Sequence, residues 1–232
     1  SLQEEHDVHF TIVNIENAAA GFGVTDSIYN ETLSLNVDAL TSGNHIYAQK
    51  TFVKDFDHYT SLVRPLNFPS KQPGEGWRLF TCGEHRIAVV NLIGRVFMNH
   101  SDCPFQKIAD LLPKIQEDSD IIIVDFHAEA TSEKQAMGWV LDGKVSAVFG
   151  THTHIQTSDE RILPKGTGYI TDLGMVGAMD SILGMEKEPI INKFFHQNPT
   201  KFRPPETHQM ILGACVFSID LSSGKCVSCQ RL

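Results

Sequence analysis

The stretch "DIIIVDFH", residues 120–127, narrows the possible folds of this chain more than any other segment. Apolar residues fill it almost without a break, whereas a strand with one face in water would alternate apolar and polar residues. A continuous apolar run of this length is typical of a central strand that is covered on both faces, as in α/β proteins. The sequence therefore predicts a layered α/β fold with helices packed against a sheet.

The rest of the chain alternates strand-like and helical segments, as such a fold requires. We expect further strands at 9–16, 37–43, 145–150 and 168–174, helices at 27–36, 50–59, 104–118, 132–141 and 188–197, and hairpins at 76–94 and 214–230. Ser132 and Gln135 have the spacing of a capping box at the start of one helix. No repeat or linker interrupts the pattern, so residues 1–232 are predicted to form a single domain.

The composition argues against several classes of function. A formal net charge of −9 disfavours stable binding to duplex nucleic acid, whose phosphates select basic surfaces. No apolar run approaches the roughly 18 residues that a membrane-spanning helix needs, so no membrane partner is expected. The five cysteines are odd in number and scattered, which suits reduced thiols in the cytoplasm. Cys226 and Cys229 lie in a predicted strand, where their spacing sends them to opposite faces, and we interpret them as structural.

Side chains that can bind metals follow four separate predicted strands. They are Glu16 and Asn17, Asn44 and His45, His127, and the pair His152 and His154. Each group alone has an ordinary explanation as a turn or a hydrogen-bonded structural residue. The "GTHTH" pair is more specific, because two neutral imidazoles one residue apart suit a transition metal. Because ligands bind beyond the carboxyl ends of strands in open α/β sheets, the four groups are expected to converge on a metal centre.

The number of donors favours two ions over one. A zinc-like ion takes three or four protein groups, and this set offers six, with His45 in addition. Two ions about 3.5–4 Å apart can clamp a phosphoryl group and stabilise both the attacking and the leaving oxygen. Such ions would also supply the positive charge that an acidic chain needs to hold a small phosphorylated substrate.

The same residues resemble known motifs. "GNH" (43–45), the isolated His127 and "GTHTH" (150–154) resemble the ordered motifs of calcineurin-like metallophosphoesterases, whose fold is a layered β-sandwich flanked by helices. "ENAAAG" (16–21), "LVRPLNFP" (62–69), "DFHAEATSEK" (125–134), residues 150–175 and "ILGMEKE" (182–188) narrow the likeness to the bacterial YmdB family, over nearly the whole chain. The resemblance implies a two-metal phosphodiesterase that acts on cyclic nucleotides of the 2′,3′-cyclic AMP type. It also implies that the chain forms homo-oligomers.

The resemblance also implies a role for each candidate residue. Glu16 would be the carboxylate that bridges both ions. Asn17 and His154 would bind the first ion, and the second ion would be bound by Asn44, His127 and His152. The ions would be divalent or of mixed valence, iron or manganese, although zinc accepts the same donors. A hydroxide generated at the metals would attack phosphorus in line, and His45 would protonate the leaving alkoxide as general acid.

The chain departs from the family pattern at its start. The family opens with a strand that ends in Gly-Asp, and this Asp binds the first metal. Asp7 precedes the strand in "HFTIVNIE" and does not match that position. We therefore expect the missing strand to lie upstream of Ser1; the alternative is an impaired first metal site.

Other functions stay open at this point. A phosphatase or nucleotidase on the same scaffold is one alternative, and a regulatory metal-binding protein with weak activity is another. A hydrolase of the β-lactamase type is disfavoured, because that class places an Asp soon after its H-x-H, where Ile155 and Gln156 stand here.

The sequence also predicts roles for several residues outside the ligand set. Arg64 and Arg95 would contact a substrate phosphate or form surface salt bridges. Support around the ligands is expected from Glu129, Thr131 and Lys134, and Asp172 would either give the same support or be structural. Three aromatic residues are expected in the core, not as platforms for a base: Phe22, Phe194 and Phe195.

Overall fold

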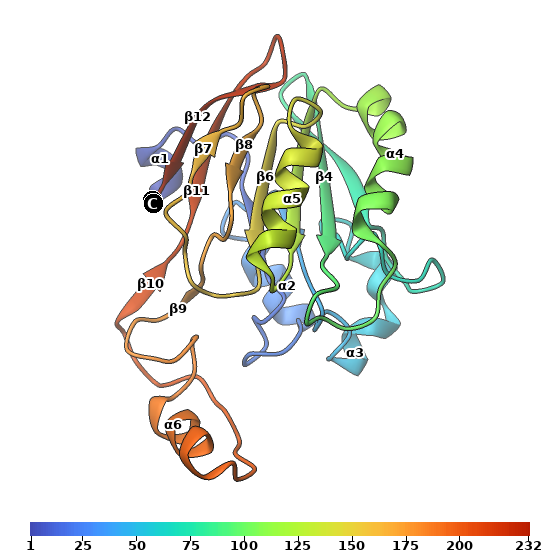
Figure 1. The fold of residues 1–232 in the computed structure, drawn as a ribbon. Helices are drawn as coiled ribbons and strands as arrows, with labels where there is room; N and C mark the ends of the chain where they lie inside the picture. The colour runs from blue at the N-terminus through green and yellow to red at the C-terminus, as the bar shows by residue number, and fades with distance from the viewer.

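The computed structural model describes residues 1–232 and is built around a six-stranded sheet of order β3-β4-β5-β6-β8-β7 (Figure 1). Its strands are β3 (Trp77–Cys82), β4 (His85–Ile93), β5 (Ile121–His127), β6 (Ala147–Thr151), β7 (Arg161–Ile162) and β8 (Gly168–Ile170). Strands β4, β5, β6 and β8 are parallel, and β3 and β7 pair antiparallel at the two edges. The carboxyl ends of β4, β5 and β6 therefore lie at one end of the sheet.

Two helices, α4 (Pro104–Asp118) and α5 (Thr131–Leu141), cover one face of this sheet (Figure 1). Helix α4 places Ile108, Leu112 and Ile115 on its buried side, the spacing of an amphipathic helix. Pro113 lies on the exposed side, and the helix continues through it. Every residue of β5 is buried, as the apolar run predicted, because the opposite face of the sheet is covered too.

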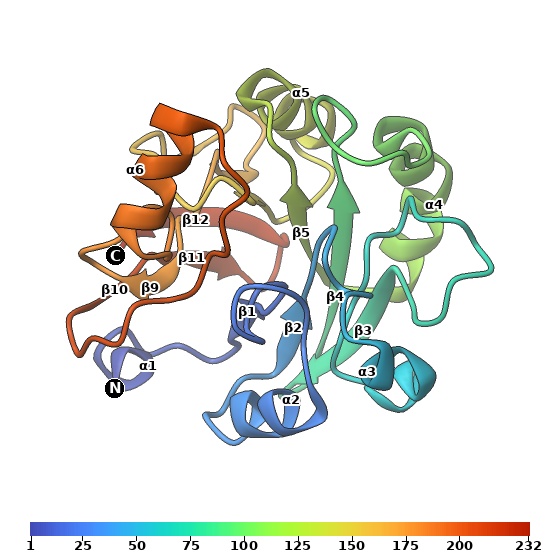
Figure 2. The same ribbon diagram turned by 90° about the horizontal axis from the view of Figure 1, so that it is seen from below.

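Two smaller sheets cover that opposite face (Figure 2). Strands β1 (Ile12–Asn14) and β2 (Ala39–Thr41) form a parallel pair, and β11 (Cys215–Asp220) and β12 (Lys225–Arg231) form an antiparallel hairpin. Helices α2 (Asp26–Leu33) and α3 (Lys50–Lys54) and the short helix η1 (Phe56–His58) pack outside β1 and β2. The predicted α/β fold with a layered β-sandwich flanked by helices is confirmed.

An arm projects from one end of this body (Figure 1). Strands β9 (Val176–Ala178) and β10 (Met210–Leu212) form its antiparallel base, and α6 (Lys187–His196) lies at its tip. Ile190 is the one buried residue of α6, whereas Phe194 is 82% and Phe195 79% exposed. The prediction that these two aromatic residues lie in the core is wrong, because the helix extends away from the body. We call residues 176–212 the arm.

Three local expectations are also corrected. Helix α5 begins at Thr131 with Ala130 as its N-cap and no side-chain cap, so the expected capping box does not form. In the last hairpin the register shifts between Ser218 and Ile219, which leaves Val227 without a partner. This extra residue brings Cys226 and Cys229 to the same face of β12, where the plain strand period predicted opposite faces.

The remaining helix, α1 (Leu2–Glu5), is a single turn near the N-terminus. None of the helices combines the length and the apolar character that crossing a bilayer requires.

Candidate metal centre

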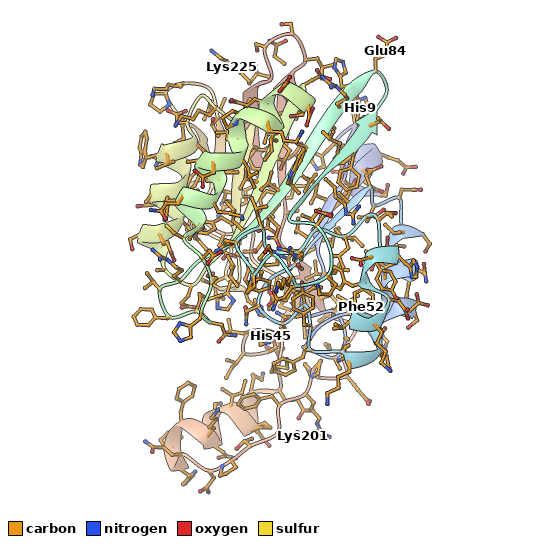
Figure 3. The ribbon with its side chains drawn as sticks, turned by 90° about the vertical axis from the view of Figure 1, so that its right-hand side faces the viewer. His9, His45, Phe52, Glu84, Lys201 and Lys225 are labelled. Carbon is orange, nitrogen blue, oxygen red and sulfur yellow. The ribbon has the colours of Figure 1, made fainter.

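The seven candidate residues gather where the strands end. His127 is the last residue of β5, His152 and His154 follow β6, and the loops after β1 and β2 carry the other four: Glu16, Asn17, Asn44 and His45. Figure 3 shows His45 at the end of the body that faces the arm, toward the side of Lys201. The convergence expected from the sheet topology is present, and the roles of the individual residues stay a prediction.

Four of these residues form what we call the inner donor group: Glu16, Asn44, His127 and His152. Nε2 of His127 lies 2.6 Å from Oε2 of Glu16, 3.0 Å from Oδ1 of Asn44 and 3.0 Å from Nδ1 of His152. A ring nitrogen carries either one hydrogen or one lone pair, so it cannot satisfy three such neighbours at once. One atom from each of Glu16, His127 and His152 lies within 4.8 Å of the others, as around a shared cation.

Asn17 and His154 form the outer donor pair, with Nδ2 of Asn17 3.1 Å from Nε2 of His154. Nδ1 of His154 lies 3.1 Å from the backbone oxygen of Leu183, which can only accept a hydrogen bond. Nδ1 therefore carries the ring hydrogen when His154 is neutral, and Nε2 keeps a lone pair that faces Asn17. The arm, through Leu183, thus fixes the orientation of this imidazole.

Two buried oxygens in the centre have no hydrogen-bond partner: Oε2 of Glu16 and Oδ1 of Asn17. Although Nε2 of His127 is close to the Glu16 oxygen, the contact lacks hydrogen-bond geometry. Burying such atoms without a partner costs free energy, and a bound cation removes that cost. Gly43 keeps the space open, because a Cβ there would overlap Oε2 of Glu16 and Nε2 of His127. Oxygen and imidazole donors in this arrangement fit divalent metal ions.

A chain of buried hydrogen bonds orients His127. Its Nδ1 lies 3.0 Å from Oγ1 of Thr151, which donates over 2.7 Å to Oδ1 of Asp125. Asn14 and Thr41 donate to the other Asp125 oxygen. Because the Thr151 hydrogen is given to Asp125, Nδ1 of His127 donates and Nε2 is left facing the inner group.

Asp125 and Thr151 were missed in the sequence. The available signal was Asp125 itself, a single acidic residue inside an otherwise apolar central strand. Burial raises the pKa of Asp125, although nearby His127 and the hydrogen bonds from Thr41, Asn14 and Thr151 oppose that rise.

The turn that carries His152 and His154 is held from behind. Both histidines have positive φ, 99° and 65°, a conformation that costs free energy for residues other than glycine. Between them, N and Oγ1 of Thr153 donate to Oδ2 of Asp172 over 3.2 and 2.7 Å. The same oxygen lies 2.6 Å from Nζ of Lys134, and both charged residues are buried. This contact gives Lys134 and Asp172 a structural link to the turn.

Of the other residues predicted to act near the ligands, some contact the centre and others do not. Oε2 of Glu129 lies 3.1 Å from Nε2 of His152, whereas Thr131 begins α5 and makes no side-chain hydrogen bond to the centre. Arg64 is buried and donates to the backbone oxygens of Gly74 and Pro65, so it does not form a surface salt bridge. The side chain of Arg95 is exposed and forms no ion pair, while its backbone N–H donates to Glu133.

The protonation states in the centre suit cation binding. Burial opposes ionisation of Glu16, but His127 and the backbone N–H of His45 outweigh it and hold the pKa of Glu16 below its usual value. Burial, aided by His127, lowers the pKa of His152 to about 4. At neutral pH the carboxylate is therefore charged and this imidazole is neutral, the forms that bind metals.

His45 lies beside the inner group. Its backbone N–H donates to Oε1 of Glu16 over 2.7 Å, and its Nε2 is 3.1 Å from Nδ2 of Asn44. The ring of Phe22 contacts the His45 ring edge to face, with 4.9 Å between centroids and 89° between planes. Phe22 is 47% exposed, so its expected place in the core is wrong.

Comparisons with known proteins identify the family and the fold. The family model described as "YmdB-like protein" matches residues 1–232. A 2′,3′-cyclic-nucleotide 2′-phosphodiesterase of Bacillus subtilis is 46% identical over 231 residues, which span 100% of this chain and 87% of that protein. A crystal structure of a hypothetical protein from Thermus thermophilus superimposes with a TM-score of 0.88 at 36% identity and covers 98% of this chain and 88% of that one. A structure titled a novel phosphatase, from Mycoplasma pneumoniae, has a TM-score of 0.88 at 32% identity, with 100% and 84% coverage.

Proposed function

Because this chain belongs to the YmdB-like family, we propose that it is a metal-dependent phosphodiesterase that hydrolyses 2′,3′-cyclic nucleotides. The observation that carries the proposal is the buried oxygen Oε2 of Glu16, which has no hydrogen-bond partner and lies in a cluster of donors with His127 and His152. The substrate class comes from the Bacillus subtilis relative, whose name specifies a cyclic nucleotide and the bond to its 2′ oxygen.

In this proposal two divalent ions occupy the centre. Asn44, His127 and His152 would hold the inner ion, Asn17 and His154 would hold the outer ion, and Glu16 would serve both. Rotating the Asn17 amide by half a turn would bring Oδ1 to the side of His154, where Nδ2 now lies. Iron or manganese is the expected metal, and zinc would accept the same donors.

When bound, the ions would supply the positive charge that neutralises the phosphoryl oxygens and would lower the pKa of a bound water. The chain supplies the remaining chemistry. His45 donates a proton to the departing 2′ oxygen, which would otherwise leave as a poorly stabilised alkoxide. Glu16 and Asn44 hold His45 in place through its backbone N–H and its ring nitrogen. The product is then the 3′-nucleotide, because the bond to the 3′ oxygen stays intact.

The test is direct. Purified protein is stripped with a chelator, reloaded with Mn²⁺ or Fe²⁺, and assayed with 2′,3′-cyclic AMP and with the monoester 5′-AMP. We expect two metal ions per chain by elemental analysis, and 3′-AMP as the product by chromatography. Turnover of 5′-AMP without turnover of the cyclic substrate would replace the proposal with a phosphatase or nucleotidase, which the Mycoplasma pneumoniae structure titled a phosphatase makes the second candidate. One ion and no turnover would instead indicate a regulatory metal-binding protein.

We also propose that the chain acts as a homo-oligomer in the cytoplasm. The support for self-association is the arm, whose tip helix leaves Ile191, Phe194 and Phe195 exposed. Exposed apolar groups of this kind mark interaction surfaces more often than isolated apolar residues do. The support for the cytoplasm is that all five cysteines are free thiols.

A further inference from the structure

Phe22 is an exposed aromatic residue beside His45, the proposed general acid. Its ring touches the ring of His45 at 4.9 Å, yet 47% of the residue is open to solvent. Single exposed apolar residues are common on protein surfaces and need no explanation on that ground alone. The position of Phe22 beside the proposed general acid, and the way its loop is built, set it apart.

The loop that carries Phe22 is fixed. The residues around it have positive φ: Ala20 at 52°, Gly21 at 96° and Gly23 at 73°. Gln49 donates through Nε2 to the backbone oxygen of Phe22 over 2.8 Å. Ala19 donates to Gly23 across the turn, and Val24 is fully buried directly after it. These contacts outweigh the strain of the backbone and hold it in this conformation. The Phe22 ring is therefore presented to solvent in a fixed position.

The leaving group of the proposed reaction brings the nucleobase to the same place. His45 protonates the 2′ oxygen, which is attached to C2′ of the ribose. C2′ is bonded to C1′, and C1′ carries the base. A side chain in contact with His45 on the open side of the site is therefore within reach of the base. The edge-to-face contact with His45 still leaves Phe22 a ring face that can stack on another ring.

We propose that Phe22 is the stacking platform for the base of the cyclic nucleotide, an inference that rests on the proposed function. Base stacking on an aromatic ring depends on the area of the base and not on its hydrogen-bonding edge. The neighbours of Phe22 in the loop are alanine and glycine, which carry no polar side chain to read that edge. Purine substrates are therefore favoured over pyrimidine substrates, with little discrimination between adenine and guanine.

The experiment compares three metal-loaded proteins: wild type, Phe22→Ala and Phe22→Trp. Each is assayed with 2′,3′-cyclic AMP, with 2′,3′-cyclic CMP and with methyl riboside 2′,3′-cyclic phosphate, which has no base. For Phe22→Ala we expect KM for the AMP substrate to rise about tenfold, the usual scale for losing one stacked base. The rise for the CMP substrate is smaller, kcat/KM for the substrate without a base is unchanged, and Phe22→Trp retains wild-type KM values.

A binding measurement gives a readout that does not depend on turnover. By titration calorimetry, Phe22→Ala is expected to bind 3′-AMP about tenfold more weakly, with unchanged affinity for inorganic phosphate. Phe97→Ala is the matched control, because Phe97 is 90% exposed on another loop and makes no aromatic contact with His45.

Two outcomes overturn the inference. An equal loss of kcat/KM on the substrates with and without a base would mean that Phe22 acts only through His45. A base-dependent loss in Phe97→Ala and not in Phe22→Ala would assign the platform elsewhere. Failure of the proposed function is distinguishable from both, because the wild-type protein would then turn over none of the three cyclic phosphates.

Discussion

The two halves of the candidate metal centre are built in different ways. In the inner donor group, Glu16 and His127 are each 1% exposed, and His127 is the end of a strand buried on both faces. In the outer donor pair, Asn17 and His154 lie on loops, and the arm orients His154 through a backbone oxygen. His127 anchors the inner half to the buried strand β5, although loops carry its other three members, whereas the outer pair has loop residues alone. We therefore expect the inner ion to bind more tightly and the outer ion to exchange.

The most severe test of this difference compares His127→Ala with His154→Ala. His127→Ala removes a ligand from the buried half, and we expect it to lose both ions and at least about a thousandfold in kcat/KM, since bound metals supply several kcal/mol of transition-state stabilisation. His154→Ala is expected to keep one ion per chain. Elemental analysis of the purified variants measures the contents. Equal metal loss in the two variants would contradict the distinction between the halves.

His45→Ala separates catalysis from metal binding. His45 contacts the inner group without being a proposed ligand, so we expect both ions to stay bound while kcat falls by roughly 10²–10⁴, the usual contribution of a general acid. Steady-state assays with 2′,3′-cyclic AMP, together with metal analysis, measure both quantities. A variant with an unchanged rate would remove His45 from this role.

Lys134→Met tests the support behind the turn that carries His152 and His154. Removing one partner of the buried Lys134–Asp172 pair leaves an uncompensated charge, so we expect the free energy of unfolding to fall by about 3–5 kcal/mol. Urea denaturation measures it. Lys144→Met, at an exposed lysine, is the matched control and should change stability by less than about 0.5 kcal/mol. Similar losses in both variants would show that burial of the pair is not the cause.

A smaller, pH-dependent effect on stability is expected from Asp159→Asn, in the loop that follows His154. Burial opposes ionisation of Asp159, but hydrogen bonds from Thr171 and Thr157 outweigh it and lower its pKa. Its stabilising contribution is therefore full above the usual aspartate pKa near 3.8 and is lost as pH falls through the lower native value. We expect the substitution to cost about 1 kcal/mol at neutral pH.

Urea unfolding at neutral pH and in acid, below about pH 3, checks this expectation. The difference between wild type and Asp159→Asn should shrink in acid. A cost that is the same at both pH values would rule out the ionised carboxylate as its source.

The smallest effect on stability is expected at the tip of the arm. Phe194→Ser combined with Phe195→Ser alters two side chains that contribute little to the core, so the free energy of unfolding should change by less than about 0.5 kcal/mol. The molar mass in solution should nevertheless fall to that of a monomer by light scattering, because the proposed contact between copies is lost. Leu35→Ser, at another exposed apolar residue, is the control and should leave the mass unchanged. An unchanged mass in the arm variant would exclude this helix as the interface.

The sequence predicted best where local pattern and burial agree. The apolar run ending at His127 correctly predicted a central strand, because a strand with apolar residues on both faces must be covered on both sides. The strand-end position of His152 placed it beside His127 through the topology of parallel sheets alone.

The errors come from features that local pattern does not contain. Phe194 and Phe195 are apolar residues in a predicted helix, which is typical of core positions. They are exposed because the arm projects from the body. The faces of Cys226 and Cys229 depend on one extra residue in β12, which the period of a strand cannot reveal. The link from Asp125 through Thr151 to His127 joins two strands, so spacing along the chain does not show it.

Gly43 provides a diagnostic for related chains. Any larger residue there would occupy the volume between Glu16 and His127, while the preceding strand β2 is fully buried and cannot retreat. The scaffold around it is held by three hydrophobic clusters that do not include this glycine. A homologue with a side chain at this position should therefore keep the fold but lack hydrolytic activity. The residue at this one position would then distinguish active members of the family from inactive ones.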